Sequence, residues 1–313
     1  MNRQEIQVIS ASDLFDAAWY RTLYNVPFFP AEDYLRDGWK KGRNPSVRFD
    51  NEVYLKLHPD VAKSGVNPLL HYELFGKKEG RPYTLDQAFP KTDVPRAEAI
   101  AHLKWPYHLK GLCDKKGFRV LEVGSRIITG ANFREFFRHA EYTGFDLHAG
   151  ENVDVVGDAH RLSTYFPSAS FDLVFCSSVF EHLAMPWVAA NEMIKLVKPG
   201  GYVFVETHYC YGAHELPWHF FQFSDTALKI LFPESHGIRC IEAGVSNPMV
   251  GRFSDRASDY LKGVYIDGLY CHSGFLGQKT AEISDLSWEQ QDISALVGHT
   301  TYPEKARGNH PIS

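Results

Sequence analysis

Four histidines of this chain follow two apolar runs and could transfer protons. His182 follows one run, and His208, His214 and His219 follow the next. Imidazole titrates near neutral pH, so a histidine beside a bound hydroxyl can take its proton. We rank His208 first as the base, because it ends a run that is typical of a strand, then His214 and His182. The alternative roles are structural: a stabilised turn at His182 and burial among aromatic residues at His219.

The spacing of His214 and His219 does not fit a zinc-protease motif. That motif needs histidines four residues apart on one helix, whereas these are five apart and Pro217 between them would break a helix. The sequence therefore predicts no metal site. A metal that holds a sugar diol stays an open alternative, with ligands drawn from His208, Glu206 and Asp225.

A second set of residues could hold a nucleotide-like cofactor at the ends of three other runs. Glu122 and Gly124 end the first run, Asp146 ends the second, and Asp158 and Ala159 follow the third. Glycine lets a ligand approach the backbone. An acid after the second strand can accept hydrogen bonds from both ribose hydroxyls, and an acid with backbone NH groups after the third could bind an adenine edge.

The first of these loops departs from the glycine-rich pattern. Its sequence is VLEVGSRIITG at 120–130, so Arg126 and Ile128 stand where glycines would recur after Gly124. Two roles of Arg126 stay open: pairing with a carboxylate of the cofactor, or covering the surface.

Both sets of residues require a sheet that brings strand ends together. From residue 118 onward, apolar runs alternate with helical stretches, which is the pattern of a parallel sheet with crossover helices. Seven strands are predicted, at 118–123, 142–146, 153–158, 171–178, 202–208, 238–245 and 274–283. Ligands of such sheets bind beyond the carboxyl ends of the strands. The predicted fold class is α/β: a Rossmann-like, seven-stranded, mostly parallel sheet with helices on both faces.

Motifs in this order resemble those of class I S-adenosylmethionine-dependent methyltransferases of the methyltransferase type 11-like group. The motifs are EVG at 122–124, Asp146, GDA at 157–159, FDLV at 171–174, EH at 181–182 and KPGG at 198–201. The resemblance covers about residues 97–285. It is strongest to bacterial members with an SRxxTG loop and an HELPWxFxxFS segment, here at 125–130 and 214–224.

The resemblance implies S-adenosyl-L-methionine as the cofactor. It implies cofactor-binding roles for Glu122, Gly124, Asp146, Asp158 and Ala159, with Ser125, Arg126 and Ser177 beside them. Because this cofactor carries an activated methyl group, the protein mainly has to align donor and acceptor.

An aromatic run at 218–223 allows two interpretations. It could cover one end of the sheet as core, or it could form a lid over the acceptor. Because it follows a strand and lacks a helical period, we favour the lid, with Trp218, His219 and Phe223 as substrate-binding residues.

The first 90 residues contain an internal duplication, with copies at about 13–48 and 49–85. Phe15-Asp16, Tyr20 and Leu23 recur 34 residues later, and Pro30, Tyr34, Gly38, Gly42 and Arg43 recur 38 residues later. Each copy predicts two short helices. The pattern resembles repeats appended to bacterial glycosyltransferases and other surface-polysaccharide assembly proteins. It suggests a pathway, and partner proteins in that pathway, rather than a reaction.

Composition excludes several classes of protein. The net charge of −5 argues against a nucleic-acid binder. No run approaches the roughly 18 apolar residues of a membrane span, and the N-terminus lacks signal-peptide features. Five separated cysteines predict reduced thiols. We therefore expect a cytoplasmic protein.

The sequence predicts a helical repeat module at 1–90 and an S-adenosylmethionine-dependent methyltransferase domain at 91–313. The expected acceptor is a small molecule or glycan, and the expected reaction is O-methylation of a sugar or glycan precursor of a bacterial surface polysaccharide. One alternative is another small acceptor, such as a lipid or quinone. A second alternative is a cofactor-binding but inactive scaffold in polysaccharide assembly, because the first loop is altered.

Overall fold

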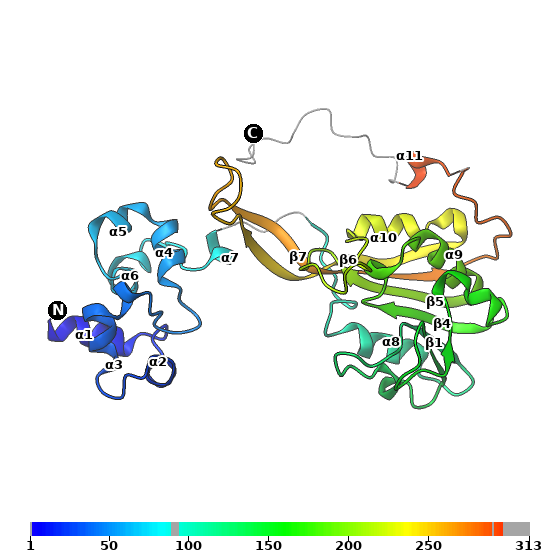
Figure 1. The fold of residues 1–313 in the computed structure, drawn as a ribbon, viewed down its shortest axis with the longest axis horizontal. Coiled ribbons are helices and arrows are strands. Elements are labelled where there is room, and N and C mark those ends of the chain that lie inside the picture. The colour runs from blue at the N-terminus through cyan, green and yellow to red at the C-terminus, as the bar shows by residue number, and fades with distance from the viewer. Residues whose placement is uncertain (1, 89–93, 290, 297–313) are drawn as a thin grey trace. The chain divides into compact units, whose positions relative to one another are not determined.

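The computed structural model describes residues 2–88, 94–289 and 291–296. The chain forms two compact units, Met1–Thr92 and Asp93–Ser313 (Figure 1). The boundary predicted between residues 90 and 91 lies outside the described residues. So does most of the C-terminal tail whose order the sequence left open. The described part of the chain contains no helix that is long and apolar enough to cross a membrane.

The first unit is built from short helices around a tyrosine-rich core. Its α-helices are α1 (Arg3–Ala11), α2 (Ala17–Tyr24), α3 (Pro30–Asp33), α4 (Asn51–Leu57), α5 (Pro59–Ser64), α6 (Pro68–His71) and α7 (Leu85–Ala88). The repeated Pro30 and Pro68 begin α3 and α6. Each of these helices continues into a π-helical turn, at Tyr34–Gly38 and Tyr72–Gly76.

The repeated glycines of this unit make room for the repeated tyrosines. A Cβ added to Gly38 would lie 2.1 Å from the hydroxyl oxygen of Tyr20, and one added to Gly76 would lie 2.4 Å from that of Tyr54. Both tyrosine side chains are fully buried. The duplication is therefore conserved in packing as well as in sequence between the two copies.

The second unit is a mixed α/β sheet of seven described strands. They are β1 (Arg119–Val123), β2 (Glu141–Asp146), β3 (Val155–Val156), β4 (Phe171–Ser177), β5 (Val197–His208), β6 (Ile238–Arg252) and β7 (Tyr265–Lys279). The strand order is β3-β2-β1-β4-β5-β7-β6. The pairs among β1 to β5 are parallel, whereas β7 runs antiparallel to β5 and β6.

Helices cover both faces of this sheet. They are α8 (Trp105–Cys113), α9 (Pro186–Leu196) and α10 (Asp225–Leu231), and the short α11 (Ile293–Leu296) follows the last strand. Alternate residues of one strand enter different cores: Val174 packs in the core that includes α9 and α10, and Phe175 packs in the core that includes α8. Figure 1 shows α9 and α10 on one side of the sheet and α8 on the other.

Several predicted element bounds differ from the structure. The strand predicted at 153–158 is reduced to the pair Val155–Val156. The last two strands are longer than predicted, since β6 and β7 each span 15 residues. The outer half of their hairpin, from Tyr265 to Cys271, pairs with β6 but not with β5. Between β1 and β2 the chain forms only a 3-10 turn at Phe133–Phe136.

Candidate functional site

The first loop leaves β1 at Gly124 with a backbone that favours glycine. Its φ is 84°, and an added Cβ would lie 2.1 Å from Cγ2 of Val179. Its NH donates to the carbonyl of Phe145 at 2.7 Å, which ties the loop to β2. Because any side chain would displace Val179, Gly124 holds this loop against the segment that follows β4.

Glu122 is buried beneath the same loop. Its side chain is 4% exposed, and Nδ2 of Asn152 donates to its Oε2 at 3.2 Å. Burial raises the pKa of Glu122 to about 8, against smaller lowering effects of Asn152 and Arg134. The side chain is therefore mostly protonated at neutral pH.

Asp146 ends β2 and holds the first loop through its carboxylate. It accepts hydrogen bonds from the backbone NH groups of Arg126 at 3.3 Å and His148 at 2.9 Å. Nε of Arg126 lies 3.6 Å from Oδ1 of Asp146, and it is buried without a hydrogen-bond partner among the described residues. The neighbouring Ser125 hydroxyl donates to the carbonyl of Asn152 at 3.0 Å. Arg126 thus contacts an acid of its own sheet.

Asp158 caps the 3-10 segment Ala159–Thr164, which begins at Ala159. It accepts from the backbone NH of His160 at 2.9 Å, and its Oδ1 lies 2.7 Å from Nδ1 of the same residue. Burial raises the pKa of Asp158, but these contacts with His160 outweigh it and lower the pKa overall. Part of the acceptor capacity of Asp158 is therefore already used within its own turn.

Ser177 ends β4 and contacts a buried acid of β5. Its hydroxyl donates to Oε2 of Glu206 at 3.2 Å. The same carboxylate accepts from Nε1 of Trp105 at 2.9 Å, and its Oε1 lies 2.9 Å from Nδ1 of His102. The contact with Glu206 raises the pKa of His102. Glu206 therefore joins the two strand ends to the segment that leads into α8.

The four histidines predicted from the sequence lie together. The ring centroid of His214 is 5.2 Å from that of His208, 4.9 Å from that of His182 and 4.6 Å from that of His219. His272 of β7 adds a fifth ring, 5.6 Å from that of His208. We call these five residues the histidine group.

Glu181 is the acid of this group. It is fully buried, its Oε2 accepts from the hydroxyl of Thr207 at 2.6 Å, and its Oε1 lies 2.8 Å from Nδ1 of His208. Burial raises the pKa of Glu181, but the His208 ring and the Thr207 hydroxyl outweigh it, and the pKa is lowered. A negatively charged carboxylate therefore lies under the histidines.

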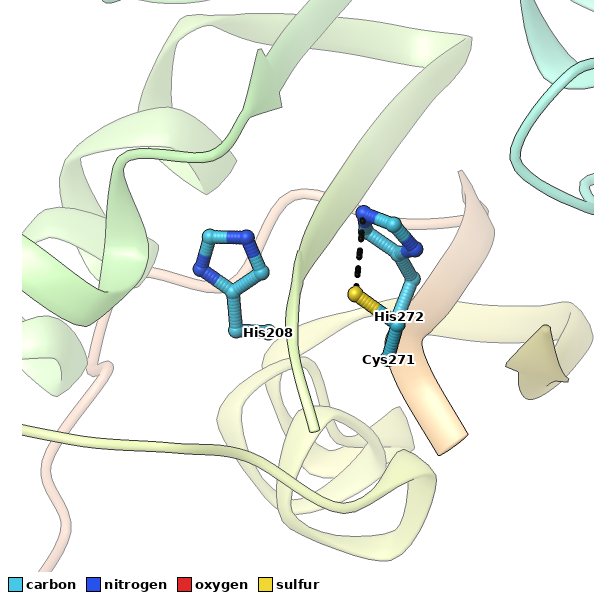
Figure 2. Close-up of side chains that lie close together, drawn as sticks. All are labelled: His208, Cys271 and His272. Carbon is cyan, nitrogen blue, oxygen red and sulfur yellow. Dashed lines mark hydrogen bonds between the residues drawn. The ribbon is translucent and has the colours of Figure 1, made fainter. Parts of the chain in front are cut away.

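His272 lies opposite His208 in the register of β5 and β7. Figure 2 shows its ring beside Cys271, with His208 on the neighbouring strand. The ring also stacks on that of His102 at 4.0 Å. Burial, together with the rings of His102 and His208, lowers the pKa of His272 to about 4. His272 is therefore neutral near pH 7.

The segment between β5 and α10 crosses the histidine group without forming a helix. The backbone NH of Phe220 donates to the carbonyl of Glu181 at 2.8 Å, and that of Phe223 donates to the carbonyl of His208 at 2.9 Å. Trp218 is 58% exposed, whereas Phe223 is 6% exposed and belongs to the core. The lid interpretation therefore suits Trp218, and the core interpretation suits Phe223.

The structure thus gathers the predicted residues into two neighbouring places. Glu122, Gly124, Ser125, Arg126 and Asp146 form the place that the sequence predicts to bind the cofactor, with Asp158 and Ala159 after β3, and we call it the cofactor side. The histidine group forms the other, and the contact between Gly124 and Val179 places the two beside each other. Ser177 lies between them at the end of β4 and contacts Glu206 rather than a histidine.

Sequence reasoning gave no role to several residues of this site. The missed residues are His102, Trp105, Glu181, His272 and Tyr211, whose ring stacks on that of His208 at 4.5 Å. Glu181 precedes His182 in the EH pair, and that adjacency was the one available signal. His272 and His102 come from segments remote in sequence, and only the pairing of β5 with β7 and the contact with Glu206 bring them here.

Comparisons with known proteins give this site a chemical class. Residues 121–205, which run from β1 to β5, match the family described as a methyltransferase domain. Over these residues the α/β unit is similar to methyltransferase domains, and this match supports the predicted cofactor, S-adenosylmethionine.

Curated relatives match a limited part of the chain. A ubiquinone biosynthesis O-methyltransferase of Paracidovorax citrulli is 33% identical over 117 residues, which are 32% of this chain and 47% of that protein. An uncharacterized methyltransferase of Mycobacterium sp. (strain KMS) is 36% identical over 72 residues, 20% of this chain and 29% of that protein. The chain thus spans less than half the length of these relatives. Among solved structures, the YcgJ protein of Bacillus subtilis aligns with a TM-score of 0.41 at 17% identity, covering 57% of this chain and 100% of that one.

Proposed function

We propose that the α/β unit transfers a methyl group from S-adenosylmethionine to a hydroxyl oxygen of a small-molecule acceptor. The observation that carries the proposal is the contact of Gly124 with Val179, two residues before Glu181. This contact sets the loop of the methyltransferase motif beside the histidine group. A methyl donor on one side and proton acceptors on the other are what O-methylation requires.

The residues of the cofactor side fit such a ligand. Gly124 holds the first loop against Val179, and Asp146 presents a carboxylate at the end of β2 where a ribose binds in related sheets. Nε of Arg126 is buried with no hydrogen-bond partner among the described residues, so it can donate to an acceptor that the ligand brings. S-adenosylmethionine supplies a methyl group already activated on a sulfonium sulfur.

The histidine group supplies the proton acceptor. The sequence ranks His208, His214 and His182 as the candidates, and their rings lie together at the carboxyl ends of β4 and β5. Trp218 is an exposed aromatic residue whose carbonyl contacts His182, and an acceptor ring can pack on its face. His219, whose ring adjoins that of His214, lies on the same side.

For the acceptor we propose a sugar or a glycan precursor of a surface polysaccharide. The N-terminal repeat supports this choice through its resemblance to repeats of polysaccharide-assembly proteins. The same repeat, whose exposed side chains include Phe28 and Phe29, is proposed as the surface for partner proteins of that assembly. A phenol of quinone synthesis is the second candidate, because two matched relatives are ubiquinone biosynthesis O-methyltransferases.

Two measurements test the proposal. Calorimetric titration with S-adenosylmethionine should give saturable binding, and its absence at millimolar cofactor would refute the proposal. A mass-spectrometric screen for methyl transfer should then compare nucleotide sugars and lipid-linked saccharides with catechols. Transfer to catechols alone would replace the glycan by the quinone assignment. Binding without transfer to either class would favour the inactive scaffold.

A further inference from the structure

Two buried atoms at the centre of the histidine group lie within hydrogen-bond distance of each other but are not aligned for a hydrogen bond. Oε1 of Glu181 and Nδ1 of His208 are 2.8 Å apart. Both are buried, and neither has an aligned hydrogen-bond partner among the described residues. Buried polar atoms are normally paired, and an unpaired one costs free energy. A cation bound to both atoms would satisfy them.

His214 completes a set of three ligands. One nitrogen or oxygen each from Glu181, His208 and His214 lie within 4.8 Å of one another. Nδ1 of His214 lies 2.9 Å from the carbonyl oxygen of Gly212. Because that oxygen only accepts, Nδ1 carries the proton and Nε2 keeps its lone pair. Such a hydrogen bond behind the ring is the usual support of a metal-binding histidine.

A second group of three, His208, Cys271 and His272, meets the same distance limit but is less suited. Both ring nitrogens of His272 are already in contact, Nδ1 with Nδ2 of Asn247 at 3.2 Å and Nε2 with Sγ of Cys271 at 3.7 Å. No buried ring nitrogen of His272 is left unpartnered among the described residues. Figure 2 shows the two side chains facing each other.

We propose that Glu181, His208 and His214 bind one divalent cation of the zinc class. Two imidazoles and one carboxylate form a donor set that such ions take in catalytic sites, where one position stays open. Ligand atoms of these ions lie about 2.0–2.2 Å from the metal. The ion would also balance the buried charge of Glu181.

The open position gives the ion a role in the proposed methyl transfer. An acceptor hydroxyl bound there becomes more acidic, and His182 can take its proton. Nδ1 of His182 lies 2.7 Å from the carbonyl oxygen of Trp218, so Nε2 is the free base. The acceptor oxygen then bonds to the methyl carbon as the bond from that carbon to the cofactor sulfur breaks. This role rests on the proposed function, whereas binding of the ion does not.

Metal analysis of the full chain tests the site. The protein is purified without a histidine tag, stripped with a chelator, loaded with Zn²⁺, desalted and analysed for metal. A parallel titration follows the visible spectrum of Co²⁺ in place of Zn²⁺. We expect about one equivalent, as the three ligands form one site. Glu181→Gln and His214→Gln should each weaken binding by at least about tenfold, the low end of the effect of losing even an outer-shell partner.

A matched control variant and an independent readout keep the result clear. His139→Gln removes an exposed histidine that pairs with Asp114 just before β2, and it should bind the ion as the unaltered chain does. Retained S-adenosylmethionine affinity in Glu181→Gln and His214→Gln would show that these variants are folded.

Three outcomes would overturn the site. They are a metal-free protein after loading, unchanged affinity in both ligand variants, and a cobalt–thiolate absorption band that Cys271→Ser removes. Failure of the unaltered chain to bind S-adenosylmethionine would instead refute the proposed function and leave the metal result as measured.

Discussion

The cofactor side and the histidine group use their residues in opposite ways. On the cofactor side, Gly124 and Asp146 act through the backbone: one gives up a side chain, and the other accepts from two backbone NH groups. In the histidine group, side chains contact side chains, as where Glu181 meets His208 and Thr207. The first loop can therefore lack its later glycines and keep its backbone conformation, whereas the histidine group depends on each of its side chains.

The largest effect is expected at His182, the base proposed above for the histidine group. We expect His182→Gln to lower kcat by about 10²- to 10⁴-fold, the usual contribution of a general base, because glutamine cannot take the acceptor proton. Affinity for S-adenosylmethionine should not change, since the loop at Gly124 does not involve this ring. Single-turnover methyl transfer and calorimetry on the same preparation measure the two effects.

His139→Gln serves as the control for His182→Gln, because it removes an exposed histidine before the start of β2. An unchanged kcat in His182→Gln would remove His182 from proton transfer. A loss of bound metal in His182→Gln would make His182 a metal ligand instead.

On the cofactor side the largest expected effect is at Asp146. Asp146→Asn removes the charge that would accept ribose hydroxyl hydrogen bonds, each worth about 1.5–3 kcal/mol for a charged partner. We expect the Kd of S-adenosylmethionine to rise about a hundredfold, which corresponds to roughly 2.7 kcal/mol. Calorimetric titration gives this value directly.

Glu141→Gln is the matched control, because Glu141 is an exposed acid at the opposite end of the same strand. Equal affinity in Asp146→Asn and the unaltered chain would separate Asp146 from the ribose.

The two places also differ in how far the sequence predicted them. Glu122, Gly124, Asp146 and Asp158 follow their strands at the motif positions, so local sequence located them. The contact of Arg126 with Asp146 was not predicted. The two roles left open for Arg126 were pairing with the cofactor and covering the surface, and neither involves an acid of the sheet. In the fold, the short β3 and the long β6–β7 hairpin escaped prediction because residues at their ends alternate little in polarity.

For the histidine group, sequence order identified the members near β4 and β5 but not their partners. His272 reaches His208 only because β7 inserts between β5 and β6 in an antiparallel direction. That pairing joins residues 64 positions apart in the chain, and no local pattern encodes it. The sequence predicted no metal site because no ligand spacing required one, and the alternative that it left open drew its ligands from His208, Glu206 and Asp225.

Gly124→Ala tests whether the cofactor side depends on backbone shape. The methyl group would lie 2.1 Å from Val179, and alanine is strained at a φ of 84°. We expect a loss of about 2 kcal/mol in the free energy of unfolding, since each residue held in such a conformation costs about 1–3 kcal/mol. Urea unfolding measures it.

The double variant Gly124→Ala/Val179→Ala separates the two causes in Gly124→Ala. It should recover the steric part and leave the backbone strain. A Gly124→Ala protein as stable as the unaltered one would contradict the packing described for this loop.

The last comparison is between two buried glutamates, one on each side. Glu122 meets the neutral amide of Asn152, and burial raises its pKa to about 8. Glu181 meets a histidine and a hydroxyl, and its pKa is lowered. A raised pKa in the folded state means that folding favours the protonated acid. Stability from Glu122 is therefore fully present below its unfolded pKa and is lost as pH rises through 8.

Glu122→Gln should remove that pH dependence. Between pH 6 and pH 8 we expect the unaltered chain to lose about 2 kcal/mol more than Glu122→Gln, since one titrating group contributes about 1.4 kcal/mol for each pH unit below its folded pKa. Urea unfolding at pH 6, 7 and 8 gives the two slopes, and parallel curves would show that Glu122 is charged. The cofactor side would then hold a buried carboxylate as the histidine group does, and its loop would depend on charge as well as on backbone shape.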